Sequence, residues 1–569
     1  VPSAFAVLQA LPLTSSGKVD RKALTAPQAS SSSEFVAPRT PTEEILASLW
    51  AALLRVEKVG AEDDFFALGG HSLLATQLIS RVRSSLGVEL PLRAFFEAPT
   101  VAALASRIES SRHSATGLVA PALVPVPRTT ALPLSFAQQR LWLIDQLEPG
   151  STAYNIPTVL SIRGALDVAS LGKAFTGLVE RHESLRTVFA TREGEPLQCI
   201  LPASDFPLPV VDLSALPATE RESQARRLAA EEALCPFDLA SGPLLRASLL
   251  RLDSEHHVLL VTMHHVVSDG WSMGVLVREL VSFYEASSSG LTPQLPPLPI
   301  QYADFASWQR DWLQGDVLQG QLDYWKQQLS GAPTLLELPT DRPRPAVQSQ
   351  RGALLPVHLP LPLSEALSAF CQREGVTPFM ALLAVWQLLL ARYSGQDDVS
   401  VGSPIAGRTR GETEGLIGFF VNTLVLRSHV QPLATFRELL TQVRASTLAA
   451  YEHQHLPFEK LVEELQPQRS LSHSPLFQVM LVLNNAPPAE LSLPGLSFVP
   501  LEREAVATKF DLTLSLTQTP RGLSGALGYR TDLFDASTVS RMVEHLQTLL
   551  EAALASPGTC VGELPLLSP

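Results

Sequence analysis

Two linker-like stretches divide this 569-residue chain and exclude a single continuous core. Residues 25–40 (TAPQASSSSEFVAPRT) and 112–130 (RHSATGLVAPALVPVPRTT) have compositions typical of linkers rather than of packed elements. The length points the same way, because domains usually hold roughly 100–200 residues. The sequence therefore predicts several units: a short segment at 1–24, a small unit at 41–111 and a large unit from 131 onward.

The small unit, residues 41–111, carries the pattern of short amphipathic helices. Apolar residues at helical spacing predict one helix from about Thr42 and a second that begins at Ser72. A last helix is expected over 101–110, with Thr100 as a candidate N-cap. Three or four short helices in about 70 residues predict a small α-helical bundle.

In the large unit, strand-like apolar runs alternate with helical patterns, which predicts an α/β fold. Val258–Met263 is a continuous apolar run of the buried-strand type, and an amphipathic helix is expected over 272–286. Roughly 440 residues are too many for one core. We therefore expect two α/β lobes, 131–300 and 301–555, followed by a linker at 556–569.

Composition narrows the classes of function. The net charge of -13 argues against a nucleic-acid partner, because binding to phosphate backbones requires basic patches. No run of about 20 apolar residues occurs, so no membrane span is expected. The chain starts with neither an initiator Met nor a signal peptide, which favours a piece of a longer cytoplasmic protein. The cysteines are far apart with no CxxC pair, so neither a zinc site nor a disulfide framework is indicated; they are Cys199, Cys235, Cys371 and Cys560.

The segment DDFFALGGHSL, which ends at Leu73, has the features of a site for an attached anionic group. Gly69 and Gly70 allow a tight turn before a helix. Ser72 then lies at the helix N-terminus, where its hydroxyl is exposed and a phosphate is electrostatically favoured. The alternative interpretation is that Ser72 only caps the helix.

The whole segment resembles the phosphopantetheine attachment motif of peptidyl carrier proteins, and the resemblance extends over 36–111. It implies that Ser72 bears 4′-phosphopantetheine, added by a separate phosphopantetheinyl transferase. The thiol of that arm would hold an aminoacyl or peptidyl thioester. With His71 before the serine, the motif resembles that of carriers that feed condensation domains. Carriers that feed epimerisation domains more often have Asp at this position.

Residues 11–24 (LPLTSSGKVDRKAL) resemble the last core motif of adenylation domains. In that family the lysine at the position of Lys18 contacts the substrate carboxylate and phosphate. The rest of such a domain is absent here, so we interpret 1–24 as an adenylation-domain remnant in which Lys18 is idle.

A second constellation, HHVVSDG from His264 to Gly270, follows the predicted buried strand. Zinc is one interpretation, but a zinc site usually offers three or four convergent ligands, and neighbouring strand residues point to opposite faces. A hydrolase triad would need a nucleophile, and no G-x-S-x-G elbow is evident. A structural role, with one histidine packed and the other exposed, stays open from the motif alone.

H-H-x-x-x-D-G resembles the signature of condensation domains of nonribosomal peptide synthetases and of the wider chloramphenicol-acetyltransferase-like acyltransferases. The resemblance spans 131–552. It implies a pseudodimer of two acetyltransferase-like lobes in a V, with a tunnel that carrier-borne donor and acceptor arms enter from opposite ends. The sixth motif departs from the family, because His455 stands where the family usually has Asp. The other segments that resemble condensation motifs in order are Ser135–Trp142, Arg181–Thr187, Tyr302–Gln309, Ile417–Thr423, His455–Glu459 and Ser474–Gln478.

The resemblance also implies roles for individual residues. His265 would project into the tunnel, while His264, Asp269 and Gly270 would shape its loop, with the glycine permitting a turn and close substrate approach. Arg408 resembles the family arginine that pairs with the aspartate. An imidazole titrates near neutrality, so His265 could take the proton of an acceptor amine or position that amine. The sequence does not separate these two roles.

The predicted function is nonribosomal peptide synthesis by an L-to-L condensation domain. A donor on the Ser72 phosphopantetheine would be joined to the amine carried by a downstream acceptor carrier. An epimerisation domain, an ester-forming variant and a catalytically silent carrier-docking module are the alternatives. A heterocyclisation domain is excluded, because it would replace the His-His pair. Residues 563–569 resemble the linker into another adenylation domain, so adjacent adenylation domains are expected partners as well.

Overall fold

The computed structural model describes most of the chain beyond the first linker. The predicted remnant with Lys18 and nearly all of the 25–40 linker lie outside the described residues. These residues are 36–38, 41–56, 58–113, 120–349, 351–374, 376–466, 470–484, 493, 495–501, 506–519 and 521–567.

The N-terminal bundle is built around aromatic side chains. Trp50, Phe65 and Phe95 are fully buried, and the Phe65 ring meets the other two edge-on, with centroids 5.0 and 4.8 Å apart. Three large rings supply much of the apolar burial that so small a unit needs. The predicted helical bundle is confirmed, and its helices are α1 (Pro41–Leu54), α2 (Ser72–Leu86), α3 (Leu92–Glu97) and α4 (Val101–His113).

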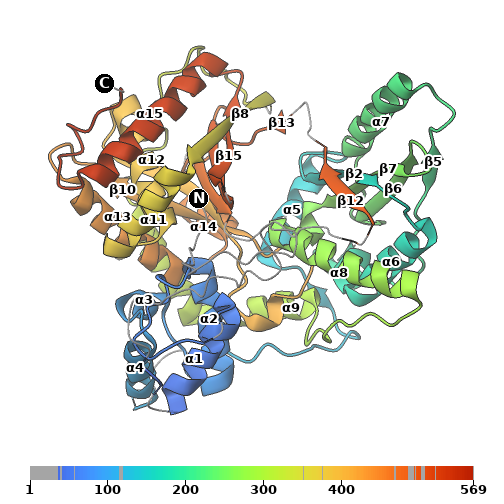
Figure 1. Ribbon diagram of the computed structural model, residues 1–569, viewed down its shortest axis with the longest axis horizontal. Coiled ribbons are helices and arrows are strands. Elements are labelled where there is room, and N and C mark those ends of the chain that lie inside the picture. Colours follow the sequence, from blue (N-terminus) through green and yellow to red (C-terminus); the bar gives the residue numbers. More distant parts are fainter. Residues whose placement is uncertain are drawn as a thin grey trace, which may run out of the picture.

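The N-terminal lobe of the large unit contains a five-stranded sheet with helices on both faces (Figure 1). Along β7, Leu259 and Val261 pack toward α6 and α8, whereas Val258 and Leu260 pack toward α7. This explains the continuous apolar run, because a strand covered on both faces needs apolar residues at every position. The elements, in sheet order, are β12 (Ser497–Pro500), β2 (Asn155–Arg163), β7 (His256–His264), β6 (Leu245–Arg251) and β5 (Val210–Asp212), with α6 (Val168–Arg181), α7 (Ala218–Ala233) and α8 (Gly270–Ser289).

The C-terminal lobe contains a seven-stranded mixed sheet that packs against four helices (Figure 1). Its central helix α12 is buried on all sides from Phe379 to Ala391, which accounts for its uniformly apolar sequence. In sheet order the strands are β10 (Asn422–His429), β9 (Asp398–Ile405), β11 (Val479–Asn484), β14 (Leu512–Thr519), β15 (Gly522–Arg530), β8 (Arg351–Pro360) and β13 (Val506–Ala507); the helices are α11 (Leu361–Glu374), α12 (Pro378–Ser394), α13 (Phe436–Glu452) and α15 (Ala536–Ala555).

Shorter elements surround the junction between the lobes. A small sheet in the order β1-β4-β3 adjoins the N-terminal lobe. The helix α9 packs against β1 and η1. These elements are β1 (Leu132–Pro133), β3 (Thr187–Arg192), β4 (Glu195–Ile200), α5 (Phe136–Leu147), α9 (Tyr302–Trp312), α10 (Gly315–Leu329), α14 (Phe458–Leu465), η1 (Glu183–Arg186), η2 (His265–Val267) and η3 (Gly411–Thr413).

Strand β12 crosses from the C-terminal half of the chain into the N-terminal lobe. Its residues pair with β2 in antiparallel register, from Ser497 with Arg163 to Pro500 with Leu160. A segment beyond the predicted boundary at 300 therefore completes the first sheet. The alternation of elements along the sequence did not indicate this exchange, because β12 is four residues long and is exposed at most positions.

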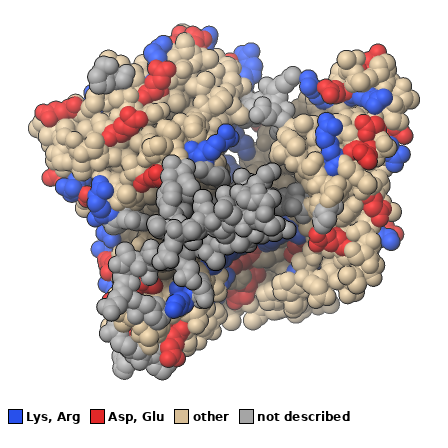
Figure 2. Space-filling view, viewed as in Figure 1, with Lys and Arg blue, Asp and Glu red and all other residues tan. Residues whose placement is uncertain are grey.

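The lobes, the cysteines, the helices and the surface charge can each be compared with the class of protein that the sequence predicted. The two-lobed α/β prediction is confirmed. All four cysteines are unpaired thiols. Among the described residues, no helix combines the length and the hydropathy needed to cross a bilayer. Acidic and basic side chains are interspersed on the face seen in Figure 2, without an extended basic field among the residues coloured there.

Candidate active site

The two motif histidines separate at the end of β7. His264 is the last residue of the strand and is buried; its Nδ1 accepts a hydrogen bond from the backbone N–H of Val266 at 3.1 Å. His265 begins the turn η2, and its backbone N–H donates to the carbonyl of Tyr154 at 2.9 Å. Its ring lies edge-on to Phe419, with centroids 5.0 Å apart. As expected for adjacent residues at a strand end, one histidine packs inward and the other leaves the strand.

Asp269 fixes the loop that carries His265. It is the N-cap of α8, and its Oδ1 accepts from the backbone N–H and the hydroxyl of Ser272, each at 2.8 Å. Its Oδ2 accepts from the backbone N–H of Phe420 in the C-terminal lobe at 3.0 Å. The carboxylate is fully buried, so these partners are needed to offset its desolvation.

Arg408 meets Asp269 as the resemblance predicted. Its Nη2 donates to Asp269 Oδ1 at 3.2 Å and to the Ser272 hydroxyl at 2.9 Å. Its Nη1 donates to the carbonyl of Leu416 at 2.8 Å, and the guanidinium lies 4.0 Å from the centroid of the Phe420 ring. Both charged groups are almost completely buried, at 3% exposure for the arginine and 0% for the aspartate. The pair therefore joins the two lobes directly behind His265.

Two glycines near this pair differ in importance. Gly407 has a φ of +66°, and a Cβ there would approach the carbonyl oxygen of Phe420 within 1.9 Å, so the position requires glycine. Gly270 is outside the left-handed region, so the expected need for a glycine in this turn is wrong. A Cβ on Gly270 would meet nothing within 4 Å, which leaves open space beside the loop.

Burial keeps the motif histidines neutral. Burial, with a smaller contribution from the positive charge of Lys509, lowers the pKa of His265 to about 4, while Asp269 opposes the shift. Burial, with smaller contributions from His265 and Lys509, lowers the pKa of His264 to about 3. Above pH 5 the His265 ring therefore offers a free lone pair. Its Nδ1 is buried and has no hydrogen-bond partner among the described residues.

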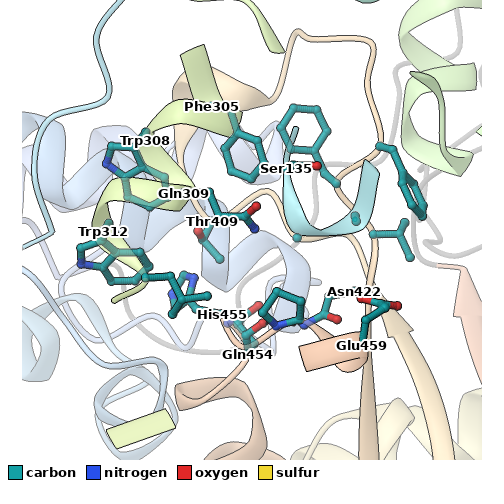
Figure 3. A pocket seen from close by; sticks show the side chains of 17 residues that line it. Ser135, Phe305, Trp308, Gln309, Trp312, Thr409, Asn422, Gln454, His455 and Glu459 are labelled. Atoms are coloured by element: carbon teal, nitrogen blue, oxygen red, sulfur yellow. Dashed lines mark hydrogen bonds between the residues drawn. The ribbon is translucent and has the colours of Figure 1, made fainter. Parts of the chain in front are cut away.

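A cavity lies between α9 and the segments 419–422 and 454–459 (Figure 3). Trp312 and His455 lie on one side, with ring centroids 4.7 Å apart, and Phe419 lines the cavity while also touching the His265 ring. The wall combines indole and phenyl rings with a few polar groups, a composition suited to a slender, partly polar ligand. Other lining residues are Ser135, Phe305, Trp308, Gln309, Thr409, Phe420, Asn422, Gln454 and Glu459.

Ser72 is the first residue of α2, and its hydroxyl does not cap the helix. The N-cap is His71, whose Nδ1 accepts from the backbone N–H of Leu74 at 3.4 Å. A Cβ on Gly70 would lie 2.2 Å from the Phe65 ring, and Gly69 has a φ of +96°, so both glycines are required for this turn. The capping alternative for Ser72 is therefore wrong, and its half-buried hydroxyl stands at a helix N-terminus, where a phosphate group is electrostatically favoured.

The bundle packs against the C-terminal lobe (Figure 1). Arg83 of α2 donates to the carbonyl of Thr409 at 3.5 Å, and the hydroxyl of Ser80 accepts from the backbone N–H of Gly411. Helix α3 packs against α13. Burial raises the pKa of Tyr451, on α13, to about 12, and a hydrogen bond with the Ser72 hydroxyl opposes that shift. The carrier-like bundle therefore contacts Thr409, a residue that also lines the cavity.

The second linker is attached to α9 rather than free along its length. The backbone N–H of Val126 and the guanidinium of Arg128 both donate to Asp304, at 2.8 and 2.6 Å. Arg128 also pairs with Glu183, and the indole N–H of Trp308 donates to the carbonyl of Pro121 at 2.9 Å. Residues 121–128 are therefore part of the large unit, which shortens the tether to the bundle.

Comparison with known families agrees with this geometry. The phosphopantetheine attachment site matches residues 44–108, and the condensation domain matches residues 128–569. The chain belongs to the condensation domain family. A carrier domain, residues 44–108, precedes the condensation domain in the same polypeptide, and condensation domains of nonribosomal peptide synthetases catalyse amide bond formation. Ser72, which begins α2 without capping it, fits the attachment of 4′-phosphopantetheine.

Curated relatives are multidomain synthetases. One of the proteins that make up linear gramicidin synthase in Brevibacillus parabrevis is 53% identical over 573 residues, which cover 100% of this chain and 7% of that protein. Phosphinothricin tripeptide synthetase from Streptomyces viridochromogenes is 44% identical, covering 92% of this chain and 44% of that protein. The crystal structure of the X-domain from teicoplanin biosynthesis superposes with a TM-score of 0.71 at 30% identity, covering 79% of this chain and 100% of that one. The chain thus spans a small part of the first relative's length.

Several residues at the site were not identified from the sequence. Phe419 lies within the predicted fifth motif, but nothing in the pattern marked it as the ring beside His265. Tyr451 and Lys509 belong to no predicted motif. Their positions follow from tertiary packing between segments far apart in the chain, which local periodicity does not encode.

Removing the Asp269 carboxylate should strongly destabilise the condensation domain. The Asp269→Ala variant leaves Arg408 buried without its counter-charge, so we expect the free energy of unfolding to fall by about 3–5 kcal/mol, measured by urea denaturation. The exposed Arg227–Glu231 pair is the matched control, and Glu231→Ala should change stability by less than about 1 kcal/mol. Similar losses in both variants would contradict the assigned importance of the buried pair.

Stability should also fall as the pH decreases from 6.5 toward 4. The pKa values of His71 and His455, like those of His264 and His265, are lowered by burial, to about 4 for the first two. Between these values and 6.5 the unfolded chain binds protons that the folded chain does not, so acidification favours unfolding. Urea midpoints at pH 7.5, 6 and 5 would measure this. A His455→Gln variant should show a shallower decline, and an unchanged slope would exclude His455 as a contributor.

Proposed function

We propose that the condensation domain joins a donor acyl group carried on Ser72 to the amine of an aminoacyl group held by a second, downstream carrier. The observation that carries this proposal is the orientation of the docked carrier domain. Ser72 lies beside Tyr451 of α13, and Arg83 of the carrier contacts Thr409. Thr409 and Phe419 both line the cavity, and the Phe419 ring packs against that of His265. In this proposal an arm attached to Ser72 reaches the cavity from the docked carrier domain.

The reaction is an attack of a neutral amine on a thioester. When bound, 4′-phosphopantetheine supplies the thiol that carries the donor acyl group. Phe419 and the indole side chains of the cavity exclude water, which would otherwise hydrolyse the donor. His265, neutral at pH 7, accepts a hydrogen bond or the proton that the amine loses as the N–C bond forms. The C–S bond of the donor thioester breaks in exchange, and the proton would pass to the departing thiolate. Holding both reactants in one site supplies much of the rate enhancement.

Asp269 and Arg408 act on this chemistry through the backbone. Their ion pair fixes the N-terminus of α8 and the segment that presents Phe419 and Phe420. His264 supports the turn by accepting from Val266. The open space beside Gly270 leaves room for the reacting groups.

The donor in this proposal is an L-aminoacyl or peptidyl group, because no epimerisation domain separates the adenylation-like segment from the carrier. A phosphopantetheinyl transferase primes Ser72. Adjacent adenylation domains of the same cytoplasmic synthetase load the two carriers. We favour amide formation over ester formation because the family forms amides. The site residues themselves would accept either an amine or a hydroxyl nucleophile.

A catalytically silent docking module is the second candidate. Its support is the likeness to the X-domain, for which a complex with the protein OxyB has been solved. The constellation of His264, His265 and Asp269 in this chain argues for chemistry instead, since a docking surface does not require a buried, unpartnered imidazole nitrogen.

A transfer assay tests the proposal. Ser72 is loaded with an aminoacyl-pantetheine by a transferase, a separately loaded acceptor carrier is added, and both carriers are followed by intact-protein mass spectrometry. We expect a dipeptide on the acceptor carrier, no loading in Ser72→Ala, and a loss of about 100-fold or more in transfer rate with His265→Ala. Equal rates with His265→Ala would indicate the docking function. Exchange of deuterium at the donor α-carbon without transfer would indicate an epimerase.

Disturbing the docking surface should impair transfer from the attached carrier only. A Gly411→Arg variant places a long side chain where the backbone meets Ser80 of the carrier, so we expect transfer from Ser72 to fall at least tenfold. Transfer from a small soluble thioester should be unchanged, because the cavity itself is intact. Gly320→Arg, at an exposed helical glycine with open space around it, is the matched control and should leave both rates unaltered.

A further inference from the structure

Lys509 brings a positive charge from the C-terminal lobe to the motif histidines of the N-terminal lobe. Its Nζ lies 4.0 Å from the centroid of the Tyr154 ring. Tyr154 accepts the backbone hydrogen bond of His265, and its ring centroid is 6.4 Å from that of His264. Only Tyr154 therefore separates the ammonium group from the active-site turn. No carboxylate pairs with it among the described residues.

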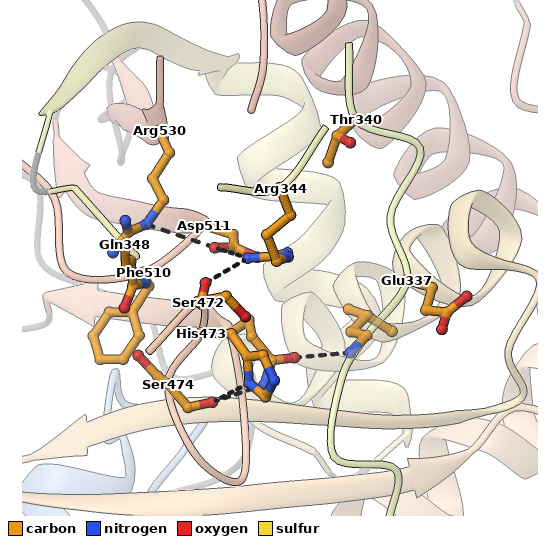
Figure 4. Close-up of polar contacts among 12 residues, drawn as sticks. Glu337, Thr340, Arg344, Gln348, Ser472, His473, Ser474, Phe510, Asp511 and Arg530 are labelled. Carbon is orange, nitrogen blue, oxygen red and sulfur yellow. Dashed lines mark hydrogen bonds and ion pairs between the residues drawn. The ribbon is translucent and has the colours of Figure 1, made fainter. Parts of the chain in front are cut away.

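A polar cluster holds the backbone from which Lys509 projects (Figure 4). The carbonyl of Lys509 accepts from Arg530 Nη2 at 2.9 Å. Arg530 also contacts Asp511 at 3.6 Å, and Arg344 binds the same carboxylate through two nitrogens, at 3.1 and 2.5 Å. Asp511 is 1% exposed, so the cluster is buried and its geometry is constrained. The backbone of Lys509 is thus fixed, and its ammonium group packs against the Tyr154 ring.

The carboxylates that face the Lys509 ammonium group are each paired with an arginine. Asp269 is paired with Arg408, and Glu459 with Arg140 at 2.5 Å. Burial, with repulsion from Arg140, lowers the pKa of Lys509 to about 8, so the ammonium form still predominates at pH 7. Lys509 lowers the pKa of His264 and of His265, as a nearby positive charge should.

We propose that Lys509 is an electrostatic positioning residue that keeps the acceptor amine neutral at the site. An acceptor α-amine has an ordinary pKa of about 8, so much of it arrives as an ammonium ion at pH 7. A fixed positive charge against Tyr154, the residue whose carbonyl holds the backbone of His265, disfavours that ion. Its extra proton is released to solvent before the attack, and the second proton is lost to His265 as the N–C bond forms. This inference rests on the proposed amine acceptor.

The test compares Lys509→Met with Lys509→Arg, since arginine keeps the charge and the interaction with an aromatic ring. The rate of dipeptide transfer from Ser72 is measured in single turnover from pH 6 to 9.5. For Lys509→Met we expect the rising limb to shift upward by about one pH unit, which is a roughly tenfold loss at pH 7 that disappears at high pH. Lys509→Arg should retain the wild-type profile. A loss of equal size at every pH would show a merely structural role and overturn the proposal.

A second measurement is independent of turnover. Histidine-labelled protein is titrated by NMR, with His265→Gln used to assign the signal. The pKa of His265 should rise in Lys509→Met and stay at its wild-type value in Lys509→Arg. An unchanged pKa in the methionine variant would overturn the proposal. A shifted pKa without dipeptide formation by the wild-type chain would instead place the failure in the proposed function.

Discussion

The buried ion pair between Asp269 and Arg408 is the interaction on which the rest of the site depends. Moving two charges out of water costs several kcal/mol for each, and their attraction offsets this only when the remaining hydrogen bonds are made. Here the carboxylate also caps α8 through Ser272 and receives the backbone of Phe420. Each of these partners comes from a different segment, so the pair is satisfied only when both lobes and the His265 turn are in place.

This constraint explains how two separately packed lobes form one reaction site. The lobes have their own sheets, and β12 adds a second connection by pairing with β2. Strand β2 is also the neighbour of β7, with Asn155 opposite His264. Strand β12 pairs with Leu160–Arg163, which lie opposite the start of β7, whereas the ion pair lies beyond the end of β7. The two connections thus hold the N-terminal lobe at opposite ends of the same strand. On this scaffold, the linker contacts with Asp304 keep the carrier domain close to the cavity mouth.

The sequence predicted those features that depend on local patterns. The buried strand at 258–263 and the helix after it were predicted within three residues at each end, because apolar periodicity is a local signal. Ser72 was likewise placed at a helix start, although the actual cap, His71, is an uncommon residue for that role. The pairing of Arg408 came from a family resemblance rather than from spacing. Lys509 and Tyr154 could not be predicted, because they are 355 positions apart and meet only through the packing of the two lobes.

The charges around the histidines show a consistent arrangement for an amine nucleophile. A buried imidazole near a positive charge is a weaker base than a free one, so His265 is poorly suited to removing a proton from an ammonium ion in solution. It is better suited to a proton that becomes acidic only as the N–C bond forms, since that proton is lost from a cationic nitrogen with a much lower pKa. Lys509 and His265 would then act on two different protons of the same amine, the first before the attack and the second during it. The compensated carboxylates Asp269 and Glu459 would not retain the ammonium form, because each is paired with an arginine.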